Sequence, residues 1–207
     1  MLFLYVDEMK TYCEAPDRCP SEKESCKLLI DYIEREYKNT KERLTAYLRE
    51  GIISFDLARY LFKPGTTILI PSPSRPAEER CLIVDYLNKE EDSRLEKVHN
   101  TRYIIDAHSM DYDGKKHWHV DHQVVIPRFT GVRNISNLPA YPLEYFAGAD
   151  EKKRDLVARG RKLLSLANYS EHVYDEECLV DGDRRIHVQG RVLIDPEGYR
   201  RYNPTSR

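Results

Sequence analysis

The residues best suited to chemistry form one histidine-rich stretch: His108, Asp111, Asp113, His117, His119 and His122. On a β-strand, His117 and His119 share a face and His122 points the other way, because successive side chains alternate. Two imidazoles on one face hold a metal ion only if further ligands come from a neighbouring strand. The sequence offers no second ligand set at a matching spacing. A solvated hairpin without metal is therefore favoured, and a metal-dependent enzyme at His117 and His119 is the weaker alternative.

The five cysteines are irregularly spaced. Cys13, Cys19 and Cys26 are clustered, whereas Cys81 and Cys178 stand alone. Ligands of a zinc knuckle are usually about two to four residues apart, so structural zinc is not predicted. No cysteine lies in a recognisable nucleophile signature. Inert free thiols in a reducing intracellular compartment, the cytoplasm or the nucleus, are the favoured interpretation.

Nucleotide hydrolysis needs a motif that this chain lacks. A P-loop is written G-x-x-x-x-G-K-[ST], because backbone amides of the glycine-rich turn and the lysine hold the phosphates. None of the nine glycines occurs in that context. The nucleophile elbow, the H-E-x-x-H motif and the dinucleotide-binding fingerprint are missing as well. The sequence therefore assigns no catalytic residue and no cofactor, and we do not expect an enzyme.

The net charge does not favour binding to nucleic acid or to an anionic membrane, because the chain has 33 basic and 35 acidic residues. Local basic groups are Lys152, Lys153, Arg159, Arg161 and Lys162 on a helix predicted for 150–166, and the pairs Arg184-Arg185 and Arg200-Arg201. A nucleic-acid-binding module that uses this helix is the second interpretation. Asp150, Glu151 and Asp155 dilute the helix, and a charge run is usually a solvated face.

No membrane association is expected. The apolar run Met1–Val6 follows no basic segment and ends at Asp7 and Glu8, so it is neither a signal peptide nor a spanning helix. No other stretch approaches the ~18 apolar residues that a spanning helix needs.

The elements that must position these residues begin with a long helix. Residues 7–20 are polar and contain Pro16 and Pro20, so a flexible lead-in is predicted for residues 1–20. Apolar residues then recur at steps of three and four through 21–51, which predicts a helical arm whose seam packs either on its own domain or on another chain. Ser54 can cap a short helix, apolar almost all round, which should be buried.

A change of period from about 3.6 to two predicts strands after Lys63-Pro64-Gly65. They are expected at 66–70, 80–87, 98–106 and 117–126 as an antiparallel meander, with a hairpin turn at Asp113-Gly114. Two closing strands are expected at 171–180 and 186–194, turning at 181–183. The predicted fold class is α+β: an antiparallel sheet or small open barrel, preceded by the long helix and packed with helix 150–166.

Residues 127–146 are too interrupted by prolines for regular pairing and too apolar to be free in water. We expect a loop packed across the sheet, with its aromatic side chains as anchors for a partner. The predicted binding residues are Phe129, Tyr141, Tyr145 and Phe146. Residues 52–204 are expected to form one domain, with 205–207 as a tail.

Several phrases, in order, resemble the N-terminal domain of unknown function that precedes the ATPase module in fungal AAA+ proteins. They are Ile53-Ser-Phe-Asp-Leu leading to Leu61-Phe-Lys-Pro-Gly, Tyr112-Asp-Gly, Ile126-Pro-Arg-Phe with Gly131, Leu138-Pro-Ala-Tyr-Pro-Leu, Arg159-Gly-Arg-Lys, and Gly190-Arg-Val-Leu-Ile-Asp with Tyr202-Asn-Pro. The resemblance spans roughly residues 28–204. No single phrase is specific, and the histidine cluster is not part of the pattern.

The resemblance implies a solitary copy of this domain without its ATPase module. It also implies a non-catalytic accessory role in which the domain helps an AAA+ motor recognise a substrate, an adaptor or a neighbouring subunit. The expected partner is therefore a protein, and any ATPase activity would belong to the missing module.

Overall fold

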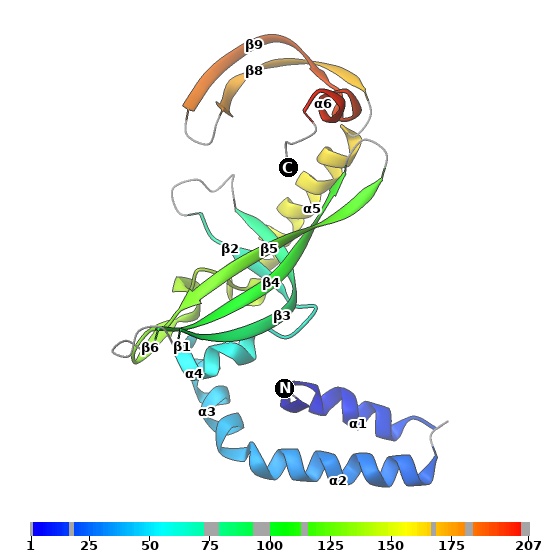
Figure 1. The fold of residues 1–207 in the computed structure, drawn as a ribbon, viewed down its shortest axis with the longest axis vertical. Helices are drawn as coiled ribbons and strands as arrows, with labels where there is room; N and C mark the ends of the chain where they lie inside the picture. Colours follow the sequence, from blue (N-terminus) through cyan, green and yellow to red (C-terminus); the bar gives the residue numbers. More distant parts are fainter. Residues whose placement is uncertain are drawn as a thin grey trace. The chain divides into compact units, whose positions relative to one another are not determined.

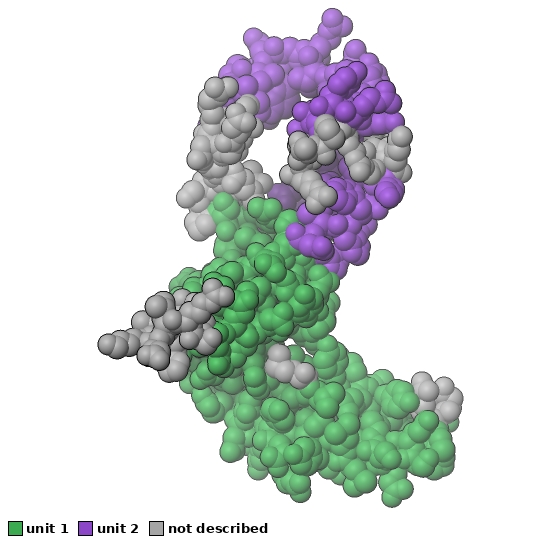
Figure 2. Space-filling view, in the orientation of Figure 1, with its two compact units in different colours: residues 1–107, 122–147 green, residues 108–121, 148–207 purple. Residues whose placement is uncertain are grey.

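The computed structural model describes residues 2–16, 19–72, 79–92, 100–112, 116–166, 169–180 and 184–203. The chain divides into two compact units (Figure 2). Unit 1 comprises residues 1–107 and 122–147, and unit 2 comprises residues 108–121 and 148–207. The N-terminal helices belong to the unit that holds most of the sheet, and the single domain expected for 52–204 stays a prediction.

Unit 1 is built on an antiparallel sheet with the strand order β5-β4-β3-β2-β7. Its strands are β2 (Thr67–Ile70), β3 (Arg80–Asp92), β4 (Asn100–Tyr112), β5 (His117–Pro127) and β7 (Tyr141–Pro142). Ile68 of β2 lies opposite Leu82 of β3 on one side and Pro142 of β7 on the other. The predicted α+β class is confirmed, as an open sheet. The predicted turn at Asp113-Gly114 lies outside the described residues.

The N-terminal residues form helices (Figure 1). A 3-10 turn, η1 (Leu2–Tyr5), leads into α1 (Val6–Glu14), and α2 (Pro20–Glu36) follows. The lead-in predicted for 1–20 is therefore mostly helical. The reason is tertiary packing, since Val6 and Cys13 of α1 are buried against Ile30 and Ile33 of α2.

The helical arm predicted for 21–51 is two helices, because α2 ends at Glu36 and α3 runs from Lys38 to Arg49. The predicted seam divides between two cores of the same chain. Ile30 and Ile33 pack against α1, whereas Leu44 joins the main core of unit 1. These apolar residues of the seam therefore pack within their own chain, which is one of the two arrangements expected from the sequence.

The main core lies between the sheet and a short buried helix, as predicted. Strand β1 (Ile52–Ser54) pairs with β6 (Val132–Asn134), and α4 (Phe55–Ala58) with the turn η2 (Arg59–Leu61) follows β1. All the apolar side chains predicted for this helix are buried: Phe55, Leu57, Ala58, Leu61 and Phe62. The ring of Phe55 stacks on Tyr103 of β4, with ring centroids 4.5 Å apart.

The segment 127–146 is not a loop across the sheet. It contributes β6 and β7 and two 3-10 turns, η4 (Ile135–Asn137) and η5 (Leu143–Tyr145). Ile135 and Leu138 are buried with the main core. Short strands suit this segment because each satisfies a few backbone groups between the prolines that interrupt it.

Unit 2 contains α5 (Ala149–Ser165), β8 (Ser170–Val180), β9 (Arg184–Ile194) and α6 (Pro196–Tyr202). Strands β8 and β9 form a separate two-stranded antiparallel sheet. Helix α5 begins after Gly148, whose φ of 84° suits glycine, and not at a cap by Asp150. No residue of α5 is buried. The turn at 181–183 lies outside the described residues.

Within the described part of the chain, no helix has the length and apolar character needed to cross a membrane.

Candidate interaction surfaces

Two of the four aromatic residues predicted to bind a partner are core residues. Phe129 and Tyr141 are only 6% and 3% exposed. Tyr141 lies in β7 opposite Leu69, and Phe129 packs edge-on against Phe55 with centroids 5.7 Å apart. They are therefore core residues of this structure, and their role as binding residues stays a prediction. The signal was ambiguous because aromatic residues serve equally in a core and at an interface.

Tyr145 and Phe146 are half-buried and pack against the same core. Burial, and then the nearby Glu144 carboxylate, raise the pKa of Tyr145, because both disfavour a charged phenolate. Burial likewise raises the pKa of Tyr141. These two phenols therefore stay neutral at physiological pH, and only Tyr145 and Phe146 keep partly accessible rings.

Helix α5 presents a basic groove of about 660 Å³. Its lining residues are Asp150, Lys153, Arg154, Val157, Ala158 and Arg161. These positions recur at helical spacing, so Lys153, Arg154 and Arg161 bring three positive charges to one stripe. Asp150 lies at the start of the same stripe and offsets part of that charge. The groove suits an anionic group, as the basic character of the helix predicted.

The apolar side chains of α5 are also accessible. Val157, Leu163 and Leu164 are 45%, 56% and 51% exposed. Exposed apolar groups clustered on one helix are typical of a surface that another polypeptide covers.

The hairpin of β8 and β9 has one apolar and one charged face. Its register places Val173 opposite Arg191 and Tyr174 opposite Gly190. Because directly opposed residues share a face, alternate pairs separate the two sets of side chains. The more apolar face carries Tyr174, Cys178, Ile186, Val188, Val192 and Ile194, together with His172 and Glu176. Gly190 has a φ of 140°, which a side chain rarely adopts.

The charged face is held together by cross-strand polar contacts. Arg185 of β9 lies 3.4 Å from Glu177 of β8, and His187 lies 2.9 Å from Asp175. These groups are well exposed, so each pair contributes little to stability on its own. Their arrangement is more informative than their strength, because the carboxylates of β8 lie next to basic side chains of β9.

The histidine cluster lies at the paired ends of β4 and β5. The rings of His108 and His119 stack with centroids 4.4 Å apart and planes within 5° of parallel, and Tyr112 contacts His117 at 4.9 Å. A metal ion binds an imidazole nitrogen in the plane of the ring, so two stacked parallel rings do not converge on one ion. Among the described residues, no group of three or more His, Cys, Asp or Glu side chains is placed to hold a metal.

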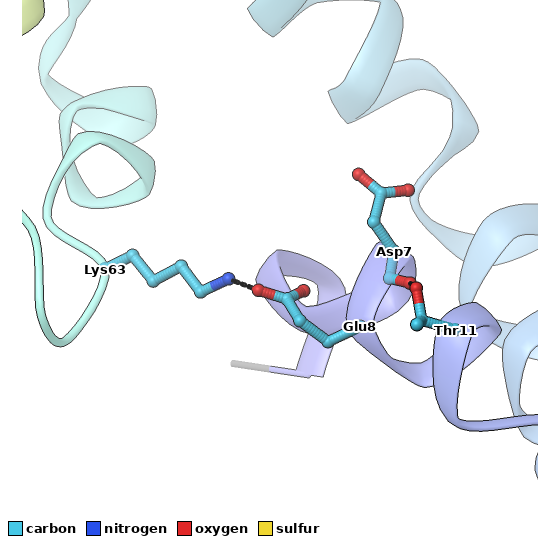
Figure 3. Close-up of polar contacts among 4 residues, drawn as sticks. All are labelled: Asp7, Glu8, Thr11 and Lys63. Carbon is cyan, nitrogen blue, oxygen red and sulfur yellow. Dashed lines mark hydrogen bonds and ion pairs between the residues drawn. The ribbon is translucent and has the colours of Figure 1, made fainter. Parts of the chain in front are cut away.

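The N-terminal helices contact the rest of unit 1 through residues that the sequence did not indicate. Lys63, just after the buried helix, forms an ion pair with Glu8 of α1 (Figure 3). The Lys63 ammonium also lies 4.5 Å from the centroid of the Tyr5 ring. A hydrogen bond from Lys63 lowers the pKa of Glu8, because it favours the charged carboxylate. Within α1, Thr11 donates a hydrogen bond to the backbone carbonyl of Asp7 at 3.0 Å.

Two cysteines have perturbed thiols. A hydrogen-bond contact with Ser21, at 3.1 Å, lowers the pKa of the exposed Cys19. A contact with the buried Cys13 raises the pKa of Cys26, and burial adds to this effect. All five cysteines are free thiols. The sequence alone did not distinguish the five cysteines, because the contacts that change the pKa of Cys19 and Cys26 form only in the tertiary structure.

The fold and surfaces define an α+β domain on an antiparallel sheet, joined to a second unit that leaves apolar side chains exposed. A family model described as Domain of unknown function (DUF7025) matches residues 43–147, slightly more than half of the chain, so the chain belongs to this family. The match ends at the residue where unit 1 ends, so α5 and the β8–β9 hairpin lie outside it. It is also shorter than the 28–204 span of the resemblance. No curated protein and no solved structure matches the chain.

Proposed function

We propose that the chain is a non-catalytic interaction domain that works with an AAA+ ATPase and recognises a substrate, an adaptor or a neighbouring subunit. The supporting observation is the difference between the two units. Among the described residues, every buried side chain belongs to unit 1 and none to unit 2. A two-stranded hairpin beside a helix is marginally stable in water unless its apolar face is covered. A partner that covers unit 2 would therefore stabilise it and be held by it.

The AAA+ part of the proposal rests on the sequence resemblance. The chain lacks a P-loop, so the ATP chemistry would belong to the ATPase and not to this domain. A reducing compartment, the cytoplasm or the nucleus, also fits the proposal, because an odd number of free cysteines is typical of intracellular proteins.

Binding to an AAA+ module encoded by the same genome tests the proposal. Biolayer interferometry with the immobilised full chain should show saturable binding. Val157→Glu combined with Leu164→Glu should weaken binding by about tenfold or more, because it charges the apolar stripe of α5. Leu28→Glu with Leu29→Glu is the matched control, since these exposed leucines lie on α2 and should leave binding unchanged. Equal losses for both pairs would contradict a role for unit 2.

The absence of catalysis is tested separately. Calorimetric titration of the purified chain with ATP and magnesium should show no saturable heat, because no glycine-rich turn is present to hold the phosphates. Micromolar binding of ATP by this chain alone would overturn the non-catalytic assignment.

A nucleic-acid-binding role is the second candidate, supported by the basic groove of α5. Lys153, Arg154 and Arg161 line it. If it binds phosphates, fluorescence anisotropy with single-stranded DNA should show affinity that falls steeply with salt. Lys153→Glu with Arg161→Glu should then abolish it. Binding that persists in this variant would exclude the groove.

A further inference from the structure

The β8–β9 hairpin has two edges that no described residue pairs. Each strand is 11 residues long, and within the described part of the chain each pairs only with the other. Natural edge strands are usually protected from pairing by charged side chains, above all lysine, or by proline, bulges or shortness. Neither strand contains lysine or proline, and neither is short. Both carry other charges, so their edges can pair only with a strand whose charges are complementary.

The charges on the two strands indicate which strand would fit. Strand β8 carries four carboxylates, Glu171, Asp175, Glu176 and Glu177, and β9 carries guanidinium groups at Arg185 and Arg191. Pairing β8 with β8 of another chain would oppose carboxylates, and pairing β9 with β9 would oppose arginines. Like charges directly opposite each other destabilise a sheet. Pairing of β8 with β9 is complementary, because Arg185 and His187 of β9 already contact Glu177 and Asp175 of β8 within the hairpin.

We propose that the free edge of β8 in one chain pairs with the free edge of β9 in a second copy. The second copy is the favoured occupant because it supplies the side-chain row that already complements β8 within the hairpin. The pairing would be antiparallel and would repeat the hairpin register, with residue 171 opposite 193 and residue 173 opposite 191. It would also make the apolar face of each hairpin part of a wider continuous sheet.

The proposed contact joins two different surfaces, so a pair of chains keeps one free β9 edge and one free β8 edge for further copies. Such a head-to-tail contact gives a closed ring if the rotation between neighbours closes, and an open filament if it does not. The inference goes beyond the proposed function, because self-association requires no ATPase.

Light scattering coupled to size exclusion, with the full chain at low salt, tests the pairing. The native chain should show a mass that rises with concentration. Glu171 and Arg191 are diagonal neighbours on the charged face, and neither forms an ion pair with a described residue. Either Glu171→Lys or Arg191→Glu should raise the dissociation constant roughly three- to tenfold, since attraction between chains becomes repulsion.

Mixing the two single variants decides the case. Lys at 171 of one chain would lie diagonally across from Glu at 191 of the other, so the mixture should regain the association that each variant alone has weakened. An effect confined within one hairpin cannot be restored by mixing. Glu24→Lys and Arg43→Glu are matched controls on α2 and α3, and they should associate like the native chain.

Other outcomes overturn the proposal. The proposal is wrong if the native chain is a monomer at every concentration at low salt. It is also wrong if Glu171→Lys and Arg191→Glu both leave the association unchanged. Association that Val188→Glu abolishes while the reversals spare it would point to the apolar face instead. If a reversal loses its strand signal in circular dichroism, Glu171→Gln and Arg191→Gln replace it and should give smaller losses in the same direction. Binding to an AAA+ module is measured separately, so the two proposals can fail independently.

Discussion

The ring of Phe3 stacks on that of Tyr37, with centroids 5.4 Å apart and planes 17° from parallel, at the point where α2 gives way to α3. Phe3 also meets Tyr60 edge-on at 5.5 Å. It packs against both hydrophobic cores of unit 1, the one between α1 and α2 and the one beneath the sheet. One ring thus links the N-terminal helices to the rest of the unit.

Removal of this ring should loosen the N-terminal helices. We expect Phe3→Ala to lower the free energy of unfolding by about 1–3 kcal/mol, less than for a fully buried phenylalanine because Phe3 is only half-buried. Hydrogen exchange of the α1 amides should accelerate more than that of β4. Leu2→Ala, at an exposed neighbour, is the control and should have little effect. Equal acceleration in α1 and β4 would contradict a local role for Phe3.

The ion pair between Lys63 and Glu8 makes the docking of α1 sensitive to acid. The pKa of Glu8 is lower in the folded chain than its ordinary value of 4.5, so the unfolded chain binds the proton more readily. Stability from the pair is therefore present above pH 4.5 and is lost as pH falls through the lowered folded pKa. Exchange of the α1 amides should accelerate there in the native chain and not in Lys63→Met. The same acid response in both chains would exclude the pair.

Thiol reactivity should follow the two perturbed cysteines. Cys19 has a lowered pKa and is exposed, so it should be alkylated by iodoacetamide before Cys26, whose pKa is raised. Peptide mass spectrometry over a time course measures the order. Ser21→Ala should slow the reaction at Cys19, because the hydrogen bond that favours the thiolate is gone. A native chain in which Cys26 reacts first would show that these contacts are wrong.

The two units should differ in their sensitivity to truncation. Ile105 is fully buried in β4, so Ile105→Ala should lower the free energy of unfolding by about 2–5 kcal/mol. Val173 is 83% exposed, so Val173→Ala should change it by less than about 0.5 kcal/mol in a dilute, unassembled sample. Urea unfolding followed by circular dichroism provides both values. A large loss at Val173 would mean that the hairpin is covered within a single chain.

Local patterns predicted much of the secondary structure. Period-two alternation located β2 to β5 and the two strands of the closing hairpin, although β3 and β4 extend further, to Asp92 and Tyr112. The all-round apolar character of 55–62 predicted a buried helix correctly. These features are local, because a strand or a buried helix must carry its apolar residues at the spacing that its own geometry imposes.

The sequence by itself determined the α+β class, the main strands and the absence of a nucleotide-binding loop, since each depends on residues close together in the chain. Only the tertiary structure decided that Phe129 and Tyr141 are core residues, because their surroundings come from α4 and β2, which lie far away in sequence. It also decided that the helical arm divides at Tyr37, where the ring of Phe3 from the N-terminal turn η1 packs. An apolar side chain indicates that it will be covered, and the rest of the chain decides what covers it.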